Sequence, residues 1–375
     1  MYDWIDEQAI PPLPAGIQLA LFGAGEGSSQ FLAWLAENAP GARVLAVADN
    51  DPTQQGREYL GLPIIEPAAL PGLKADLVVV TTVSGREAVG GQLAAMGLLE
   101  GKDFVRIGAY PAAGLKNLLP LLEWDRSLGG ILREGGAAVH VGPGGFLGLE
   151  CGLYALRGMR TTAVDAYSFG LDWPEVTGRR QEYEKTRTAA LRLAGNGTAE
   201  DVGRRWDSLF AERDGRLFLE GIPFRFPHDF SALPVDSASM DLACSFAVLE
   251  HVRDPRRCVE ELWRVLKPGG VAVQTIVTRD HRSFGKTAGY TPISYRVHSS
   301  EEWERINQDR FYQNRLAPWQ WRELFAAVGF EERHYHEHGR YVPGGEEYAA
   351  LHPDFQGWSE DRMSAVDCTL LARKM

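Results

Sequence analysis

The sequence lacks several features that mark particular classes of protein. Only four of its 375 residues are cysteine, and no two form a CxxC pair, which argues against a zinc knuckle or a disulfide scaffold. No apolar run approaches the roughly 20 residues that a membrane span needs, and the first residues, MYDWIDEQ, are acidic and polar where a secretory signal is basic and then apolar. Aspartate and glutamate outnumber lysine and arginine by 50 to 39, which disfavours a surface that collects nucleic-acid phosphates. We therefore expect a cytoplasmic protein with no membrane or nucleic-acid partner.

The sequence does contain a strand–turn–helix pattern that occurs twice. From residue 17 to 107, apolar runs alternate with segments of helical spacing, which is typical of a parallel sheet covered by helices on both faces. The pattern restarts with AAVHV at residue 137, and 375 residues exceed one ordinary core. We predict an α/β fold with two Rossmann-like domains. The boundaries are 1–110 for the first domain, 111–134 for a helical connector, and 135–375 for the second domain with an insertion at 168–222.

Two parts of the second domain extend this pattern. The insertion at 168–222 has two segments of helical spacing. It either lies over an active site, as long functional connections do, or decorates the outside of the domain. Near the end of the chain, EERHYHEH and DCTLLARKM are strand candidates that would form an antiparallel addition to the sheet.

A glycine-rich turn, HVGPGGFLGLE, stands between the first strand and the first helix of the second domain. Gly142, Gly144 and Gly145 carry no side chains, so the backbone there can approach a ligand closely. Asp165 ends the next strand, where an acid can hold the two hydroxyls of a ribose. These residues predict a site for a ligand that contains a nucleoside.

Further candidates for this ligand site follow along the chain. Asp229 and Phe230 precede the strand MDLACSF and offer a polar group and an apolar face for an adenine ring. Ser245, at the end of that strand, would close the site. His251 starts a helical segment, and we expect it to pack under the bound cofactor.

The motifs HVGPGGFLGLE, TTAVDAY and HDFSALPVDSASMDLACSFAVLEHVRDPRRCVEELWRVLKPGGV resemble successive motifs of the class I methyltransferase family, in which LEHV and LKPGG recur. The resemblance implies a seven-stranded sheet with one antiparallel strand and S-adenosyl-L-methionine as cofactor. One departure is Phe146, which stands where the family has its third glycine. A bulky side chain at that place would alter the approach to the methionine part of the cofactor.

The first domain has a weaker match to a dinucleotide-binding turn. Gly23 and Gly25 occupy the first two glycine positions, Ser28 the third, and Asp49 ends the second strand. The layout is similar to the short Rossmann-like domains at the front of sugar-modifying acyltransferases and of some methyltransferases. That resemblance implies a second nucleotide, nucleotide-sugar or CoA-like ligand at Gly23, Gly25 and Asp49. The alternative is a domain for dimerisation or substrate presentation that binds no nucleotide.

Methyl transfer by direct displacement depends on alignment of the reacting atoms, and an oxygen nucleophile also needs a base. Ligands of open α/β sheets bind beyond the carboxyl ends of the strands. His281 follows the strand VAVQTIV and is our first candidate for the base, with Tyr290 and His298 as helpers in the next loop.

A histidine stripe near the C-terminus invites a different interpretation. His334, His336 and His338 alternate and would share one face of a strand, as metal ligands can. No acid or cysteine cluster is tied to them by spacing, so we interpret them as the solvent face of a terminal strand and predict no metal site.

Together these observations favour an S-adenosylmethionine-dependent methyltransferase that acts on a small molecule, with a sugar or nucleotide-linked sugar of polysaccharide or secondary-metabolite synthesis as one substrate class. A homodimer is one expectation for its assembly. Two alternatives stay open at this point. One is a non-catalytic nucleotide-sensing or scaffold protein, and the other is an NAD-dependent oxidoreductase or epimerase that uses the first domain.

Overall fold

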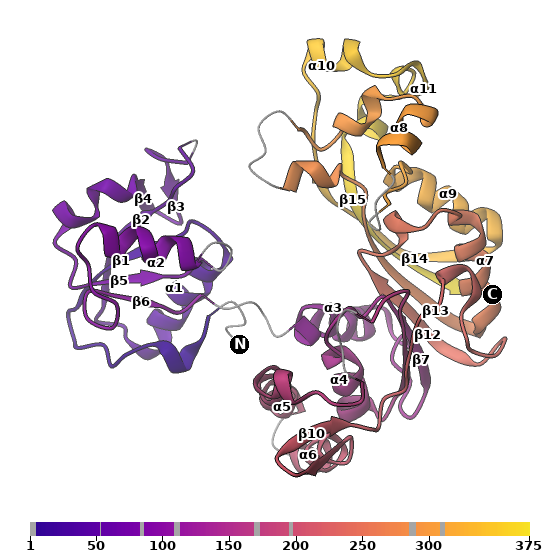
Figure 1. Ribbon diagram of the computed structural model, residues 1–375, viewed down its shortest axis with the longest axis horizontal. Helices are drawn as coiled ribbons and strands as arrows, with labels where there is room; N and C mark the ends of the chain where they lie inside the picture. The colour runs from indigo at the N-terminus through magenta and orange to yellow at the C-terminus, as the bar shows by residue number, and fades with distance from the viewer. Residues whose placement is uncertain are drawn as a thin grey trace. The chain divides into compact units, whose positions relative to one another are not determined.

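The computed structural model describes residues 5–52, 54–82, 86–108, 113–168, 173–194, 198–284, 290–307 and 312–375. The chain divides into two compact units, Met1–Ala112 and Ala113–Met375, here called unit 1 and unit 2 (Figure 1). The expected connector at 111–134 contains a helix, α3 (Ala113–Leu128), that belongs to unit 2. No described helix combines the length and the apolar character that crossing a membrane requires.

Unit 1 is built on a six-stranded sheet with the order β3-β4-β2-β1-β5-β6. All neighbouring strands pair in parallel except β3 with β4, as the alternation of strands and helices predicts. Its elements are β1 (Gln18–Phe22), α1 (Glu26–Asn38), β2 (Arg43–Ala48), β3 (Glu58–Tyr59), β4 (Leu62–Ile65), β5 (Leu77–Val80), α2 (Arg86–Ala95) and β6 (Phe104–Arg106). The central strands are apolar because helices or loops cover both faces of the sheet.

Unit 2 has a seven-stranded sheet with the order β11-β8-β7-β12-β13-β15-β14. The pairings make β15 the one antiparallel strand of this sheet. The seven strands and the antiparallel addition confirm the sequence prediction. The strands are β7 (Ala137–Val141), β8 (Arg160–Val164), β11 (Phe224–Arg225), β12 (Met240–Phe246), β13 (Leu266–Val277), β14 (Phe330–Arg340) and β15 (Ala365–Lys374).

Helices cover both faces of this sheet (Figure 1). One face packs against α7 (Pro255–Val265) and α9 (Pro318–Val328), whose apolar side chains join the largest core cluster. The other carries α4 (Gly148–Arg157), on which α3 packs. The KPGG segment, which has the composition of a turn, is already part of β13, and an irregular register between Met240 and Leu242 of β12 accommodates it.

The insertion between β8 and β11 contains α5 (Arg180–Ala194), α6 (Ala199–Asp207) and a hairpin of β9 (Phe210–Arg213) and β10 (Arg216–Leu219). The two helices were predicted, whereas the hairpin was not. Both helices pack on α4, with buried side chains such as Tyr183 and Trp206. The described part of the insertion therefore thickens the outside of the domain.

A second addition follows the carboxyl ends of β13 and β14. It contains α8 (Ser300–Ile306), α10 (Gly345–Ala350), α11 (Pro353–Gln356) and α12 (Glu360–Ser364), and we call it the cap. Its own small core includes Ile293, Leu351 and Met363. Because β14 is parallel to β13, the cap extends from the edge of the sheet at which the glycine-rich turn lies (Figure 1).

Candidate functional site

The glycine-rich turn of unit 2 has a backbone that only glycine adopts easily. Gly142 has φ +75° and Gly144 has φ +68°. A Cβ added to Gly142 would lie 2.3 Å from Cγ2 of Val248. The backbone at Gly142 is therefore closely apposed to the loop after β12, and a side chain there would displace one of the two.

Two side chains join the ends of this motif. His140 lies on β7 and Glu150 on α4; both are buried, and Nδ1 of His140 is 2.6 Å from Oε1 of Glu150. This contact therefore joins β7, before the turn, to α4, after it. The pairing was not predicted, because an interaction ten residues apart in sequence has no periodic signal here.

Asp165 lies directly after β8 and beside the turn. Its side chain accepts hydrogen bonds from the backbone N–H groups of Gly144, at 3.2 Å, and Tyr167, at 3.0 Å. The residue is only 5% exposed, and burial raises the pKa of its carboxyl above the usual value despite those hydrogen bonds. A ligand that donates hydroxyl hydrogens to this carboxylate would relieve that cost.

A cavity of about 550 Å³ opens at this place, at the carboxyl ends of β7, β8 and β12. Five of the predicted cofactor residues line it, namely Gly142, Asp165, Asp229, Phe230 and His251. Gly144 and Gly145 form the turn beside it without lining it. The position agrees with the general rule that ligands of open α/β sheets bind beyond the carboxyl ends of the strands.

Ser245 does not line this cavity. It is fully buried, and its hydroxyl donates to Oε1 of Gln274 on β13. Successive side chains of a strand point to opposite faces of the sheet. The side chain of Ser245 points toward Gln274 and away from the cavity. The prediction that Ser245 closes the ligand site is therefore not supported by its position.

Phe146 also points away from the cavity. Its ring is 6% exposed, and its centroid is 4.6 Å from the ring centroid of Tyr183 on α5. It belongs to the cluster that joins α4 to the insertion. The large side chain at the third-glycine position therefore anchors α5 rather than crowding the ligand.

Several lining residues were not found from the sequence. Tyr312 is separated from the glycine turn by 170 residues of chain, and the guanidinium of Arg253 lies 4.2 Å from the centroid of its ring. Cys258, on α7, also lines the cavity, and burial raises the pKa of its thiol to about 12. Arg253 and Cys258 stand within the methyltransferase-like motif but were not assigned to the site, and no motif or spacing marks Tyr312.

The predicted base lies next to the cavity. His281 begins η6 (His281–Phe284), and its ring centroid is 4.9 Å from that of His251 in η5 (Leu249–His251). Burial, followed by the charge of His251, lowers the pKa of His281 to about 4. At neutral pH the imidazole is therefore uncharged.

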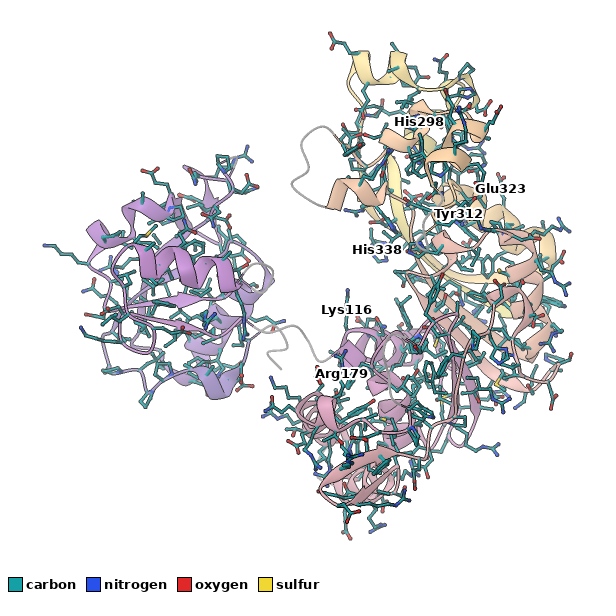
Figure 2. All side chains as sticks on the ribbon, viewed as in Figure 1. Lys116, Arg179, His298, Tyr312, Glu323 and His338 are labelled. Atoms are coloured by element: carbon teal, nitrogen blue, oxygen red, sulfur yellow. The ribbon has the colours of Figure 1, made fainter. Side chains whose placement is uncertain are left out.

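The two predicted helpers gather around Arg282. Its guanidinium carbon lies 4.5 Å from the ring centroid of Tyr290 and 5.0 Å from that of Trp303, on which His298 stacks. His298 lies beside α8 (Figure 2). Burial, followed by the charge of Arg282, lowers the pKa of His298. Tyr290 and His298 thus belong to the cap and do not line the cavity.

The turn of unit 1 also begins with a glycine at positive φ and lies beside an acid. Gly23 has φ +110°, Gly25 is the N-cap of α1, and the carboxylate of Asp49 accepts from the N–H groups of Ala24 and Asp51, both at 2.8 Å. Ser28, at the third-glycine position, is buried and donates to the carbonyl of Gly23. A small side chain there completes the packing of α1 on the sheet.

The histidine stripe lies on β14, where His336 and His338 are exposed. Among the described residues, the side chains that could hold a metal ion together are Glu250, His251 and His281 instead.

Residues 211–274, which include β12, the LEHV segment and α7, match the methyltransferase domain family. A protein of Mycolicibacterium smegmatis described as a "probable S-adenosylmethionine-dependent methyltransferase" is 34% identical over 74 residues. This segment of unit 2 is therefore similar to the methyltransferase domain family. The resemblance inferred from the motifs is thereby confirmed, and with it S-adenosylmethionine as the cofactor of the family. The match spans 20% of this chain and 29% of the length of that relative.

Solved methyltransferase structures are also similar to this chain. One is the geranyl diphosphate C-methyltransferase of Streptomyces coelicolor, at 14% identity over 70% of this chain and 84% of that one, with a TM-score of 0.36. Another is a SAM-dependent methyltransferase of Methanosarcina mazei, at 18% identity over 65% of this chain and 95% of that one, with a TM-score of 0.36.

The residues present fit S-adenosylmethionine. Gly142 lines the cavity without a side chain, a buried carboxylate follows β8 at Asp165, and the ring of Phe230 offers an apolar surface to the cavity. These match the amino-acid, ribose and adenine parts of the cofactor in turn.

Proposed function

We propose that the protein transfers a methyl group from S-adenosylmethionine to a small-molecule acceptor. The observation that carries the proposal is the cavity at the carboxyl ends of β7, β8 and β12, with Gly142 and Asp165 in its wall. The cofactor, when bound, supplies an electrophilic methyl group on a sulfonium sulfur. The acceptor must then approach in line with that bond, so positioning accounts for much of the rate.

The residues of the chain have distinct parts in this proposal. The turn at Gly142 brings the backbone against the amino-acid part of the cofactor, and Asp165 accepts hydrogen bonds from the ribose hydroxyls. Asp229 and Phe230 face the adenine. Tyr312 and Arg253 line the side of the cavity that faces the cap. We propose that the acceptor binds at this side.

The proton of an oxygen acceptor needs a destination. His281 is uncharged at neutral pH and can accept a proton, but a pKa of about 4 makes it a weak base, and catalytic bases work best near the operating pH. His298 and Tyr290 surround Arg282 in the cap, further from the cavity wall. We propose that His281, as the group nearest the acceptor, accepts this proton.

The substrate class rests on unit 1. We propose that it is a Rossmann-like domain whose turn at Gly23 and Gly25 binds a nucleotide-type ligand, with Asp49 beside it. A sugar or nucleotide-linked sugar is then the acceptor class of first choice. The parallel order β4-β2-β1-β5-β6 and the turn geometry support this proposal.

Calorimetry with S-adenosylhomocysteine on the full chain tests the cofactor site, and incubation with a labelled methyl donor and cell extract tests transfer. We expect micromolar binding and a labelled small molecule. Binding without any labelled product would favour a sensor or scaffold, and no binding up to millimolar concentration would refute the proposal.

For unit 1, a thermal shift with NAD, CoA or a nucleotide sugar should disappear in Asp49→Ala. A thermal shift with NAD alone would favour the oxidoreductase.

A further inference from the structure

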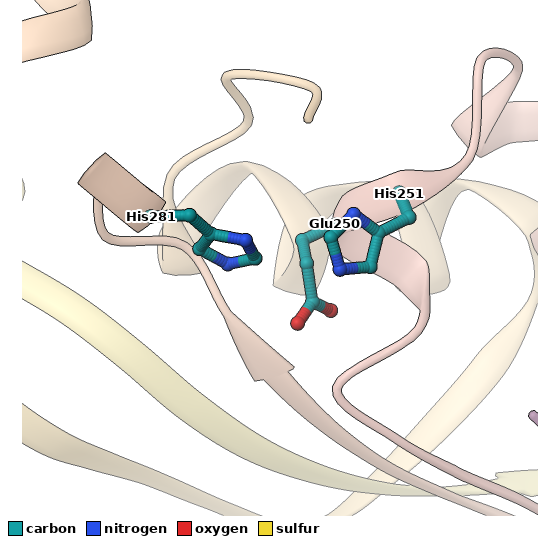
Figure 3. Close-up of side chains that lie close together, drawn as sticks. All are labelled: Glu250, His251 and His281. Carbon is teal, nitrogen blue, oxygen red and sulfur yellow. The ribbon is translucent and has the colours of Figure 1, made fainter. Parts of the chain in front are cut away.

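Three side chains with metal-ligand chemistry meet at the edge of the cofactor cavity. Glu250 and His251 come from η5, after β12, and His281 comes from η6, after β13. One ligand atom from each lies within 4.8 Å of those of the other two. Figure 3 shows the two imidazole rings and the carboxylate gathered around a common point.

Glu250 is the most unusual member of this group. It is 0% exposed, and neither carboxylate oxygen has a hydrogen-bond partner among the described residues. A buried carboxyl group without partners is costly in either protonation state. A cation bound to this carboxylate would supply the missing partner.

The two histidines are set up to present lone pairs. Nδ1 of His251 lies 2.8 Å from the carbonyl oxygen of Tyr312, so that nitrogen donates and Nε2 carries the lone pair. Histidine ligands of metals commonly have their second nitrogen fixed by a carbonyl in this way. The ring centroid of His281 lies 4.9 Å from that of His251, which brings the second imidazole to the same place.

We propose that Glu250, His251 and His281 bind a divalent transition-metal ion beside the cofactor cavity. Two imidazoles and one carboxylate suit Zn²⁺, Fe²⁺, Co²⁺ or Mn²⁺, whereas Mg²⁺ and Ca²⁺ prefer sites made of oxygen. Three protein ligands leave coordination positions open, as in catalytic rather than structural sites. His251 lines the cavity, so these positions are within reach of a molecule that occupies it.

A metal ion at this site would hold the oxygen of the acceptor next to the methyl group of the cofactor. This role of the metal rests on the proposed function. A divalent ion bound to a hydroxyl lowers the pKa of that hydroxyl, so its proton passes to solvent water and no strong base is needed. The lone pair of His281 cannot both coordinate a metal and accept a proton. The metal role therefore replaces the role of His281 as free base.

Titration of chelator-treated full-length protein with Co²⁺ tests the site, because cobalt bound by imidazole and carboxylate absorbs visible light and the bands report its geometry. We expect one equivalent to bind, Zn²⁺ to displace it and Mg²⁺ to leave it in place. Each of His251→Ala, His281→Ala and Glu250→Gln should weaken binding by about 100-fold or more, since even changes beside the ligands cost 10–100-fold. Binding that is absent, or unchanged in all three variants, would overturn the proposal.

The exposed histidines of β14 provide a matched control. His336→Ala combined with His338→Ala should leave the cobalt spectrum unchanged, and a spectrum lost in that variant alone would assign the ion to β14 and refute the proposal. Circular dichroism reports whether each ligand variant is folded, and S-adenosylhomocysteine binding adds the same check for Glu250→Gln and His281→Ala, whose side chains do not line the cavity. Glu250→Gln keeps the volume of the side chain and is the safest of the three.

The same proteins separate this inference from the proposed function. S-adenosylhomocysteine that binds metal-free protein, with no cobalt uptake, supports the cofactor site and refutes the metal site. Cobalt uptake without S-adenosylhomocysteine binding supports the metal site and refutes the proposed function. Metal uptake that is normal in Asp165→Asn would show that the ion does not depend on the cofactor pocket, which supports a separate metal site.

Discussion

The glycine turns of the two units form the same backbone hydrogen bonds. Gly23 donates to the carbonyl of Ala48 and Gly142 to that of Val164, each at 2.8 Å. In each case the acid after the second strand accepts from the turn, Asp49 from Ala24 and Asp165 from Gly144. The strand–turn–acid pattern therefore gives both turns this pair of contacts, although Gly25 has φ −145° where Gly144 has φ +68°.

The units differ in what lies opposite the turn. In unit 1, Thr82 lies against Gly23, and the hydroxyl of Thr81 is 2.6 Å from that of Ser28. In unit 2, the loop from Ala247 to Asp254 and the distant Tyr312 form a second wall, and a cavity remains between the walls. In unit 2 the segments around the turn therefore leave room for a ligand beside it.

The third position of each turn provides the test with the largest expected effect. Phe146→Ala removes a ring buried against Tyr183 and should destabilise unit 2 by about 3–5 kcal/mol, whereas Ser28→Ala removes one buried hydrogen bond of unit 1 and should cost about 1 kcal/mol. Denaturant unfolding followed by binding of S-adenosylhomocysteine measures the first. Folded Phe146→Ala should bind the ligand normally; lost affinity would place the ring in the site.

The first glycine of each turn distinguishes a ligand contact from a purely structural one. Gly142→Ala forces a Cβ against Val248 and strains the backbone at φ +75°, so we expect at least about a 100-fold loss of S-adenosylhomocysteine affinity. Gly23→Ala imposes the same kind of strain in unit 1 and should leave that affinity unchanged. Calorimetry measures the S-adenosylhomocysteine affinity of both variants. An equal loss of affinity in the two would contradict the assignment of this ligand to unit 2.

The two acids extend the comparison to the ribose. Asp165→Asn replaces charge-assisted hydrogen bonds with neutral ones, and we expect S-adenosylhomocysteine to bind about 10–30-fold more weakly, or about 1.5–2 kcal/mol. Asp49→Asn serves as the matched control and should have no effect on this ligand. An unaffected Asp165→Asn would argue that the ribose hydroxyls lie elsewhere.

The pH dependence of binding should show the smallest effect. Burial raises the pKa of Asp165, so in the folded, ligand-free protein the carboxylate is disfavoured. Its contribution to stability is therefore present below the unfolded value and decreases as pH rises through the raised pKa. Ribose hydroxyls favour the carboxylate, so affinity should fall several-fold as pH is lowered through that range. Isothermal titrations of Asp165→Asn should show no such fall.

Much of the fold could be predicted because local patterns specify it. Alternating apolar runs located β1, β2, β5, β7 and β12, and a capping box at Ser299 and Glu302 located the start of α8. The hairpin β9–β10 and the cap helices α10, α11 and α12 were missed, because short strands and short helices carry little periodic signal. The start of β13 at Leu266 was missed because the KPGG composition indicates a turn.

The candidate site divides in the same way. Gly142 and Asp165 stand in a motif and were found, as was His251 in LEHV. Ser245 was placed in the site by its position at a strand end, but the alternation of side chains along β12 turns it toward Gln274. Tyr312 was missed because the segment between α8 and α9 that brings it to the cavity has no pattern of its own, and Arg253 was missed although it stands two residues after His251.

The sequence alone determined the order of the local elements: strand, glycine turn, helix, strand, acid, twice along one chain. This follows because glycine conformation, apolar periodicity and helix capping act over a few residues. Only the tertiary structure decided that the second turn faces a cavity, that Phe146 packs away from it, and that Glu250, His251 and His281 meet. Those outcomes depend on contacts between residues far apart in the chain, and on the burial that such contacts impose.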